Sequence, residues 1–142
     1  MPKCQVFKLD DEDLMEVVPD GLYMKYYIGE NISVAVMKFV QEKGANIPAK
    51  PHSHGEEVSL QVRGSCSVWE DDPVTGKGEQ YPFNTGEALI VPAGMMHTGT
   101  NSFDEDGLCL RLNVVTPPRE EYSRGEKKPF YPLKDNGAGE QR

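Results

Sequence analysis

This 142-residue chain contains few of the residues that are typical of disulfide-rich, membrane-spanning or nucleic-acid-binding proteins. It has only three cysteines and no CxxC pair, and its N-terminus lacks the pattern of a secretory signal, so we expect reduced thiols in the cytoplasm. No apolar run approaches the roughly 20 residues that a membrane-spanning helix needs. Basic residues are also scarce, with 15 Lys and Arg against 23 Asp and Glu and a net charge of −8. This balance argues against nucleic acid and anionic membranes as partners.

Helical patterns are scarce too, and short strand patterns take their place. Runs rich in β-branched and aromatic residues are separated by Gly, Pro and polar turns, as in antiparallel sandwiches and barrels. We expect an all-β domain at 21–120, an N-terminal segment at 1–20 and a polar tail at 121–142 that packs in part and ends in disorder. Within the first segment, "DDEDLMEVV" favours a helical turn or two. The predicted strands are Leu22–Gly29, Ile32–Val40, Glu57–Gly64, Ser65–Glu70, Glu87–Val91 and Leu108–Val115.

Histidine occurs three times, and each position suits metal binding. On a strand His52 and His54 project from one face, about 6–7 Å apart, and two glutamates follow them. Imidazole suits zinc, copper, iron and nickel, whereas carboxylate suits harder ions such as manganese. The third histidine, His97, follows a PAG turn that we expect to aim it back toward the strand ends. Without an ion, the first pair would be two ordinary hydrogen-bonded strand residues.

These stretches resemble the two motifs of the cupin superfamily, G-x5-HxH-x3,4-E-x6-G and G-x5-PxG-x2-H-x3-N. The second motif is matched at every position, by Gly86, Pro92, Gly94, His97 and Asn101. The first is matched at His52, His54, Glu57 and Gly64, with one residue fewer than the family places before the glutamate. The resemblance implies a jelly-roll β-barrel (a double-stranded β-helix), commonly a homodimer, with one divalent transition metal per chain, either Fe, Zn, Mn or Ni.

The residue that is missing from the first motif affects which side chain would be the fourth metal ligand. By resemblance the ligands are His52, His54, His97 and Glu57. A deletion inside the strand would turn every later side chain to the opposite face, whereas the turn at Gly55 tolerates it, so we keep Glu57. Two alternatives stay open: Glu56 is the ligand if the turn is wider, or three histidines and water complete the site. In the second case Gln61 contacts the substrate or the metal.

Substrate contacts are expected from the residues that share the inner face. Gln61 lies on the same face of its strand as Glu57, and Arg111 suits an anionic or carbonyl-bearing group. Met95 lies beside His97 and would make the pocket mouth apolar. The ordinary alternatives are a solvated face for Arg111 and core packing for Met95.

The resemblance implies a metal-dependent enzyme that acts on a small organic substrate as a dioxygenase, isomerase, cyclase or lyase. Glu57 is the candidate catalytic base, with Glu56 or a metal-bound hydroxide as alternatives. A non-catalytic cupin that binds a small molecule is the second hypothesis. A purely structural barrel is the third, and the retained histidines argue against it. By the same resemblance Val6–Leu9 is a candidate edge strand that joins the sheet of a partner subunit.

Overall fold

The computed structural model describes residues 14–41, 53–70 and 78–119, with residues 3, 4, 6 and 12 as isolated positions. His52, residues 7–9 of the expected exchanged strand and the tail from residue 120 onward lie outside this part of the chain. The described residues form nine strands, β1 (Met15–Val18), β2 (Leu22–Ile28), β3 (Ser33–Val40), β4 (Glu56–Arg63), β5 (Ser65–Glu70), β6 (Gln80–Phe83), β7 (Ala88–Val91), β8 (His97–Ser102) and β9 (Leu108–Thr116).

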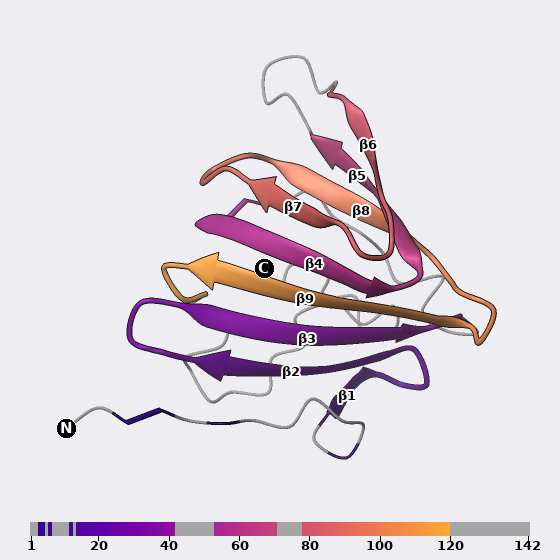
Figure 1. The fold of residues 1–142 in the computed structure, drawn as a ribbon, viewed down its shortest axis with the longest axis horizontal. Coiled ribbons are helices and arrows are strands. Elements are labelled where there is room, and N and C mark those ends of the chain that lie inside the picture. Colours follow the sequence, from indigo (N-terminus) through magenta and orange to yellow (C-terminus); the bar gives the residue numbers. More distant parts are fainter. Residues whose placement is uncertain are drawn as a thin grey trace, which may run out of the picture.

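Two antiparallel sheets build the domain, and the chain crosses between them repeatedly (Figure 1). The larger sheet has the strand order β1-β2-β3-β9-β4-β7, and the smaller sheet has the order β6-β5-β8. From β4 the chain passes to β5 and β6 of the smaller sheet, back to β7, across to β8 and back to β9. This antiparallel crossing confirms the predicted all-β fold of jelly-roll type.

The structure contains three strands, β1, β6 and β8, that are not among those predicted from the sequence. β1 occupies residues for which a helical turn was expected, and its pairing with β2 decides its conformation. β6 contains Pro82 and lies at an edge of the smaller sheet, where a residue without an N–H is tolerated. β8 has the polar sequence HTGTNS, and it is a strand because β5 pairs with it along its whole length.

The inner face of the larger sheet is apolar on β2 and β3 and polar on β4. Strict alternation along β4 buries Glu57, Ser59 and Gln61, none of which is more than 5% exposed. The polar side chains of β4 therefore point into the barrel, on the face that the alternation predicted. An apolar core cluster packs beside them and consists of Leu22, Met24, Ala35, Met37, Phe39 and Cys109.

The outer face of β4, β7 and β9 carries apolar side chains that contact solvent. Val58 pairs with Ile90 on one side and with Val114 on the other. Exposed fractions reach 42% at Leu60 and 65% at Ile90. An outward apolar surface next to a polar interior reverses the usual arrangement of a half-buried sheet. This outer apolar face consists of Val58, Leu60, Val62, Ile90, Leu112 and Val114.

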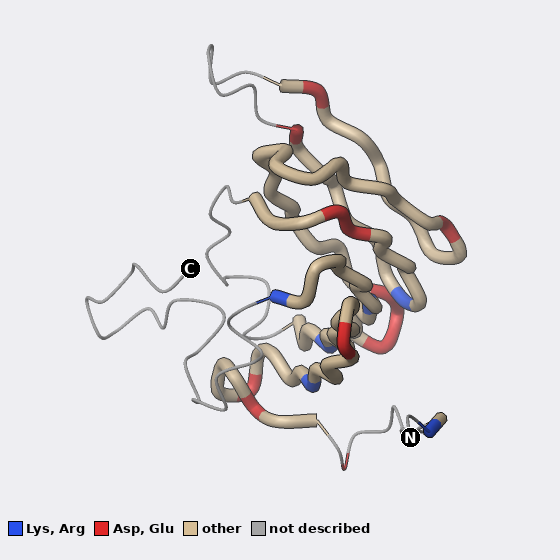
Figure 2. Tube along the Cα trace, turned by 90° about the vertical axis from the view of Figure 1, so that its left-hand side faces the viewer, with Lys and Arg blue, Asp and Glu red and all other residues tan. Residues whose placement is uncertain are grey.

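Charged side chains are distributed over the surface of both sheets. The acidic residues, red in Figure 2, lie on several separate elements. Arg63 at the end of β4 forms ion pairs with Asp104 and Asp106, and so ties β4 to the β8–β9 turn. Among the described residues, no helix is long and apolar enough to cross a membrane.

Candidate metal centre

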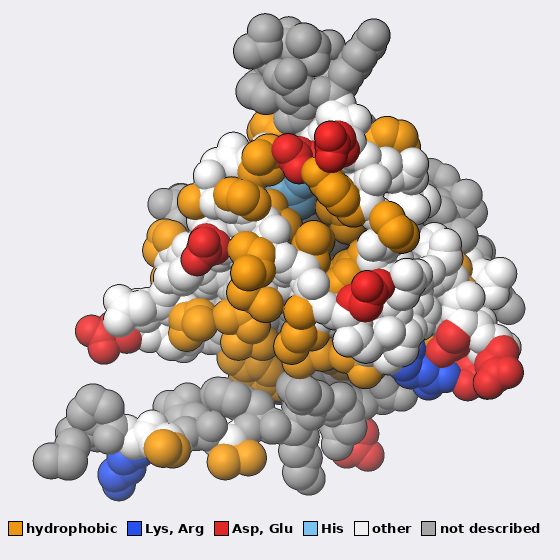
Figure 3. Space-filling model, turned by 45° about the horizontal axis from the view of Figure 1, so that its top comes forward, with side chains coloured by type: hydrophobic (Ala, Val, Ile, Leu, Met, Phe, Trp, Pro, Cys, Tyr) orange, Lys and Arg blue, Asp and Glu red, His pale blue; other side chains and the backbone are white. Residues whose placement is uncertain are grey.

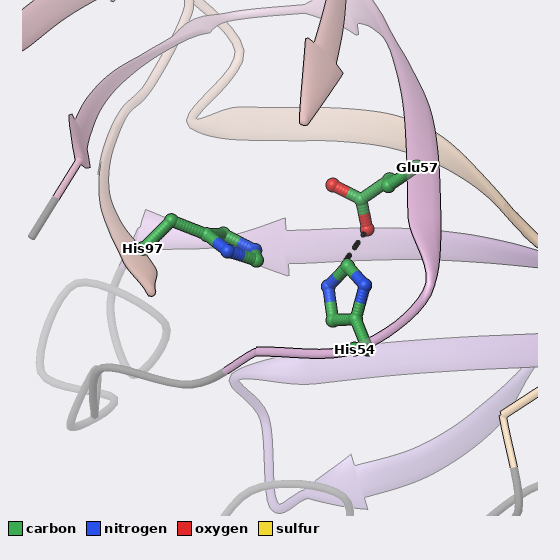
Figure 4. Close-up of side chains that lie close together, drawn as sticks. All are labelled: His54, Glu57 and His97. Atoms are coloured by element: carbon green, nitrogen blue, oxygen red, sulfur yellow. Dashed lines mark ion pairs between the residues drawn. The ribbon is translucent and has the colours of Figure 1, made fainter. Parts of the chain in front are cut away.

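Three side chains from the two sheets converge inside the barrel. His54 lies just before β4, Glu57 is the second residue of β4, and His97 is the first residue of β8. Their nitrogen and oxygen ligand atoms all lie within 4.8 Å of one another. Figure 4 shows the three side chains pointing toward a common point from different elements. Within the part of the chain that the structure describes, this is the group of side chains arranged to hold a metal ion.

One backbone hydrogen bond links the two predicted motifs. The amide of Gly94 donates to the carbonyl oxygen of His54 at 2.9 Å. Gly94 has a φ of +78°, a left-handed conformation that glycine adopts without steric cost. The amide of Met95 closes the same turn by donating to the Pro92 carbonyl at 3.1 Å. The PAG turn therefore holds the His54 segment directly and presents His97 two residues after Met95.

The short turn between His54 and Glu57 is pressed against the end of β9. A methyl group added at Gly55 would lie 2.3 Å from the Thr116 carbonyl oxygen and 2.8 Å from Cδ of Pro117. Only glycine fits such a close approach of two backbone segments. The missing residue is thus absorbed in this turn, and β4 keeps the register that points Glu57 inward.

Both histidines of the centre have the same hydrogen-bond arrangement. His54 Nδ1 lies 2.7 Å from the carbonyl oxygen of Gly55, and His97 Nδ1 lies 2.9 Å from that of Met95. A carbonyl oxygen only accepts, so each neutral ring carries its proton on Nδ1 and directs the lone pair of Nε2 to the centre. Such contacts fix the tautomer and ring orientation that metal-binding histidines require.

Each of the two oxygens of the Glu57 carboxylate has a polar neighbour that holds the side chain in place. Oε1 lies 3.5 Å from Nε2 of His54, and Oε2 lies 2.9 Å from the Ser59 hydroxyl. The same hydroxyl lies 3.0 Å from the Asn113 amide oxygen, and it donates its single proton to one of the two acceptors. Glu56 is exposed on the opposite face of β4. The geometry therefore brings Glu57, and not Glu56, to the two histidines.

The protonation state of His54 suits metal binding. Burial lowers the pKa of His54, and the electrostatic influence of Arg119 and His97 adds to this effect. The hydrogen bond to Gly55 and the charge of Glu57 oppose it and raise the pKa. Because the pKa is lowered overall, the imidazole is neutral near pH 7 and can act as a ligand.

The donor set fits a divalent transition metal. Two imidazole nitrogens and a carboxylate oxygen are common ligands of zinc and iron. Metal bonds of about 2.1 Å place neighbouring ligand atoms roughly 3–4 Å apart, and the 3.5 Å between His54 Nε2 and Glu57 Oε1 falls in this range. His52 lies outside the described residues, so its role as a third imidazole ligand stays a prediction.

The motif positions agree with a match to a known family of domains. A family model described as "Cupin domain" matches residues 37–115, which is more than half of the chain. The chain belongs to the cupin family. The three converging residues of this cupin all lie within the matched part.

Comparison with known proteins adds a sequence relative and solved structures. An uncharacterised protein of Streptomyces coelicolor is 28% identical over 116 residues, which cover 82% of this cupin and 98% of that protein. KdgF from a Halomonas species superposes with a TM-score of 0.61 at 22% identity, covering 83% of this cupin and 98% of KdgF. An RmlC-like cupin from Shewanella frigidimarina superposes with a TM-score of 0.62 at 17% identity, covering 86% and 99% of the two chains. At these identities the two structures establish the fold alone.

A second polar group of this cupin lies further along the inner face. Arg111 donates to the Asn101 amide oxygen at 2.9 Å and to the Gln61 amide oxygen at 3.3 Å. Its guanidinium also lies over the ring of Phe39, 5.3 Å from the centroid. Asn101, the last residue of the second motif, thus orients a buried arginine. The Gln61 amide oxygen accepts from Arg111, so it is engaged away from the metal centre.

The entrance to the barrel is apolar where it can be seen. In the space-filling view a histidine, pale blue, lies at the bottom of a hollow whose rim consists mostly of apolar side chains (Figure 3). Met95 is half-buried in the turn before His97, and its role at the pocket mouth stays a prediction.

Arg119 is a functional candidate that sequence reasoning missed. Its side chain is only 8% exposed, although it follows the last strand and two prolines. Its charge contributes to the lowered pKa of His54, and its backbone amide donates to the Ser33 hydroxyl at 3.3 Å. No local pattern could have revealed it, because its position follows from the contact between the end of β9 and Gly55.

Proposed function

We propose that this cupin is a metal-dependent enzyme that acts on a small organic substrate at a centre formed by His54, Glu57 and His97. One observation supports it above all: backbone carbonyls hold both imidazole rings at Nδ1, and the three side chains offer ligand atoms within 4.8 Å of one another around a buried carboxylate. His52 is proposed as the third imidazole ligand from its motif spacing. One divalent ion per chain would complete the centre, and iron, zinc, manganese and nickel all accept such ligands.

A bound metal would supply Lewis-acid polarisation of a substrate oxygen. The chain's own residues would orient the substrate and move protons. Glu57 Oε1 faces the histidines and is the candidate ligand atom. Oε2, next to the Ser59 hydroxyl, is then the oxygen that accepts a proton from the substrate, which makes Glu57 the candidate catalytic base.

The remaining inner side chains are proposed to bind the substrate. Arg111 and Gln61 present polar groups deeper in the barrel, and Met95, half-buried next to His97, is proposed to line the entrance. Isomerisation, cyclisation and elimination need a base such as Glu57, whereas a dioxygenase needs a redox-active metal. The identity of the metal therefore separates these reactions. The second candidate function is a binding module in which the same centre holds a ligand without turnover.

Metal analysis of protein purified without added metal tests the proposal. We expect about one ion per chain and a loss of affinity of at least about 100-fold in His97→Ala, because a ligand is removed. Thr100→Ala, which changes an exposed residue of the same strand, should keep the affinity of the wild type. Failure of the wild type to take up zinc, nickel or iron in a titration would refute the centre. So would a natively folded His97→Ala protein with unchanged affinity.

Turnover assays separate the two candidate functions. The metal-loaded protein would be incubated with small organic acids, sugars and aromatic compounds, with and without oxygen. Conversion that is lost in Glu57→Gln supports the enzyme with Glu57 as base. Recovery of every bound compound unchanged supports the binding module.

We also propose that the chain forms a homodimer through the outer apolar face. Glu56 lies at one corner of this face and Lys38, next to Leu110, lies diagonally across its apolar centre. A two-fold axis through that centre would bring Glu56 of one protomer to Lys38 of the other. A second copy of the chain would thus cover the apolar side chains of this face and bring opposite charges together.

A cytoplasmic location is proposed as well. Cys4, Cys66 and Cys109 are all free thiols. Free cysteines persist in reducing compartments, so this state supports the location expected from the sequence.

A further inference from the structure

Ser59 is a buried serine on the inner face of β4, next to the candidate metal centre. Its side chain is 2% exposed and lies on the same side of the strand as Glu57, two residues earlier. A hydroxyl in such a place has lost its contacts with water, so it needs partners within the protein. Those partners are the side chains of Glu57 and of Asn113, which is the residue opposite Ser59 on β9.

The chemistry of these two acceptors decides which of them receives the hydroxyl proton. The Ser59 oxygen lies 2.9 Å from Glu57 Oε2 and 3.0 Å from the Asn113 amide oxygen, so the distances alone favour neither. A carboxylate that binds a metal is ionised, and a hydrogen bond to an ionised group is about twice as strong as one to a neutral amide. The hydroxyl of Ser59 therefore donates to Glu57. The Asn113 amide can turn over and donate its NH2 group to the Ser59 oxygen, which completes the row.

The two oxygens of the Glu57 carboxylate consequently have different neighbours. Oε1 lies 3.5 Å from Nε2 of His54, whereas Oε2 accepts the hydrogen bond from Ser59. In general a carboxylate binds a metal through one oxygen or through both. Turning Oε2 toward the metal would break the hydrogen bond and leave the buried hydroxyl of Ser59 without its stronger acceptor, which is costly.

We propose that Ser59 is a positioning residue that holds Glu57 Oε2 away from the metal, so that Glu57 binds the ion through Oε1 alone. This inference rests on the proposed metal centre and deepens it. A coordination position that a second carboxylate oxygen would occupy then stays open to water or substrate. Oε2 also stays available as the oxygen that accepts a proton in the proposed reaction, so one carboxylate serves as both ligand and base.

Infrared difference spectra between zinc-loaded and metal-free protein test this role without any need for turnover. The antisymmetric and symmetric stretching bands of a carboxylate lie further apart when one oxygen binds a metal than when both do. The bands that disappear in Glu57→Gln are those of Glu57. At saturating zinc we expect the wide separation in the wild type and a narrow one in Ser59→Ala. Ser59→Thr keeps the hydroxyl and should keep the wide separation.

Zinc titration of the same variants accompanies the spectra. The affinity should fall by about 10-fold in Ser59→Ala, as is usual when a partner of a ligating group is removed. A merely structural role of Ser59 would lower the affinity as well, but it would not narrow the separation of the Glu57 bands. The band separation therefore decides between the two roles.

The control and the contrary outcomes are distinct. Ser67 alternates on β5 with the buried Cys66 and Val68 and so faces away from the barrel interior, and Ser67→Ala should keep the affinity and the spectrum of the wild type. If the wild type takes up no zinc, the proposed metal centre fails and this inference fails with it. If zinc binds but the wild type already shows the narrow separation, or Ser59→Ala keeps the wide one, the role of Ser59 is refuted and the metal centre stands.

Discussion

Replacing Gly55 with alanine tests how the short first motif is accommodated. The added methyl group would meet the Thr116 carbonyl oxygen at 2.3 Å, the Thr116 carbonyl carbon at 2.8 Å and Pro117 Cδ at 2.8 Å. Two of these atoms are backbone, so no side-chain rotation relieves the clash. The end of β9 would have to retreat by about 1 Å to reach an ordinary contact of 3.4 Å.

The magnitude follows from the cost of overpacking. Inserting a methyl group where backbone must shift lowers the free energy of unfolding by about 3 kcal/mol, the upper part of the usual range. An unfolding entropy of about 2.1 cal/mol/K per residue converts this loss into a fall of roughly 10 °C in Tm for a chain of 142 residues. Because Gly55 adjoins His54 and its carbonyl orients the His54 ring, we also expect metal affinity to fall by at least about 10-fold.

Thermal unfolding and metal titration of Gly55→Ala measure both effects. Gly86→Ala is the matched control, since Gly86 has a φ of +85° and open space around its Cα. It should lose only about 1–2 kcal/mol through left-handed strain and keep its metal affinity. A Gly55→Ala protein with the Tm and metal affinity of the wild type would show that the turn is not confined as described.

Two further predictions concern the thiols and the outer apolar face. The exposed Cys4 should react rapidly with a thiol reagent at pH 8, whereas the buried Cys109 should react only on unfolding. Burial raises the pKa of the Cys109 thiol and so lowers its thiolate fraction. Equal reaction rates of the two cysteines in the folded protein would contradict this prediction. Sedimentation should give the mass of two chains for the wild type and of one chain for Leu60→Glu, which places a charge on the outer apolar face. The control Thr100→Glu should remain dimeric. A monomeric wild type, or a different protein bound to this face, would rule out the proposed homodimer.

The sequence contained enough information for the fold class and for most of the candidate centre. Alternation in β4 predicted that Glu57 and Gln61 share an inner face, because side-chain direction in a strand has a period of two. The PAG turn predicted that His97 would be aimed back at the preceding strands, because proline and glycine restrict the backbone locally. Polar strands such as β8 escaped prediction, since their pairing partner and not their composition makes them strands.

The amino-acid sequence by itself determined which residues have metal-binding chemistry and which faces of the strands they occupy, because both properties are local. Only the tertiary structure decided which distant residues meet. It placed Glu57 rather than Glu56 beside His54, fitted Gly55 against Thr116, and brought Arg119 to the same end of the barrel. The contacts of Gly55 and Arg119 join segments about 60 residues apart, so they depend on how distant strands come together and on no pattern within either segment.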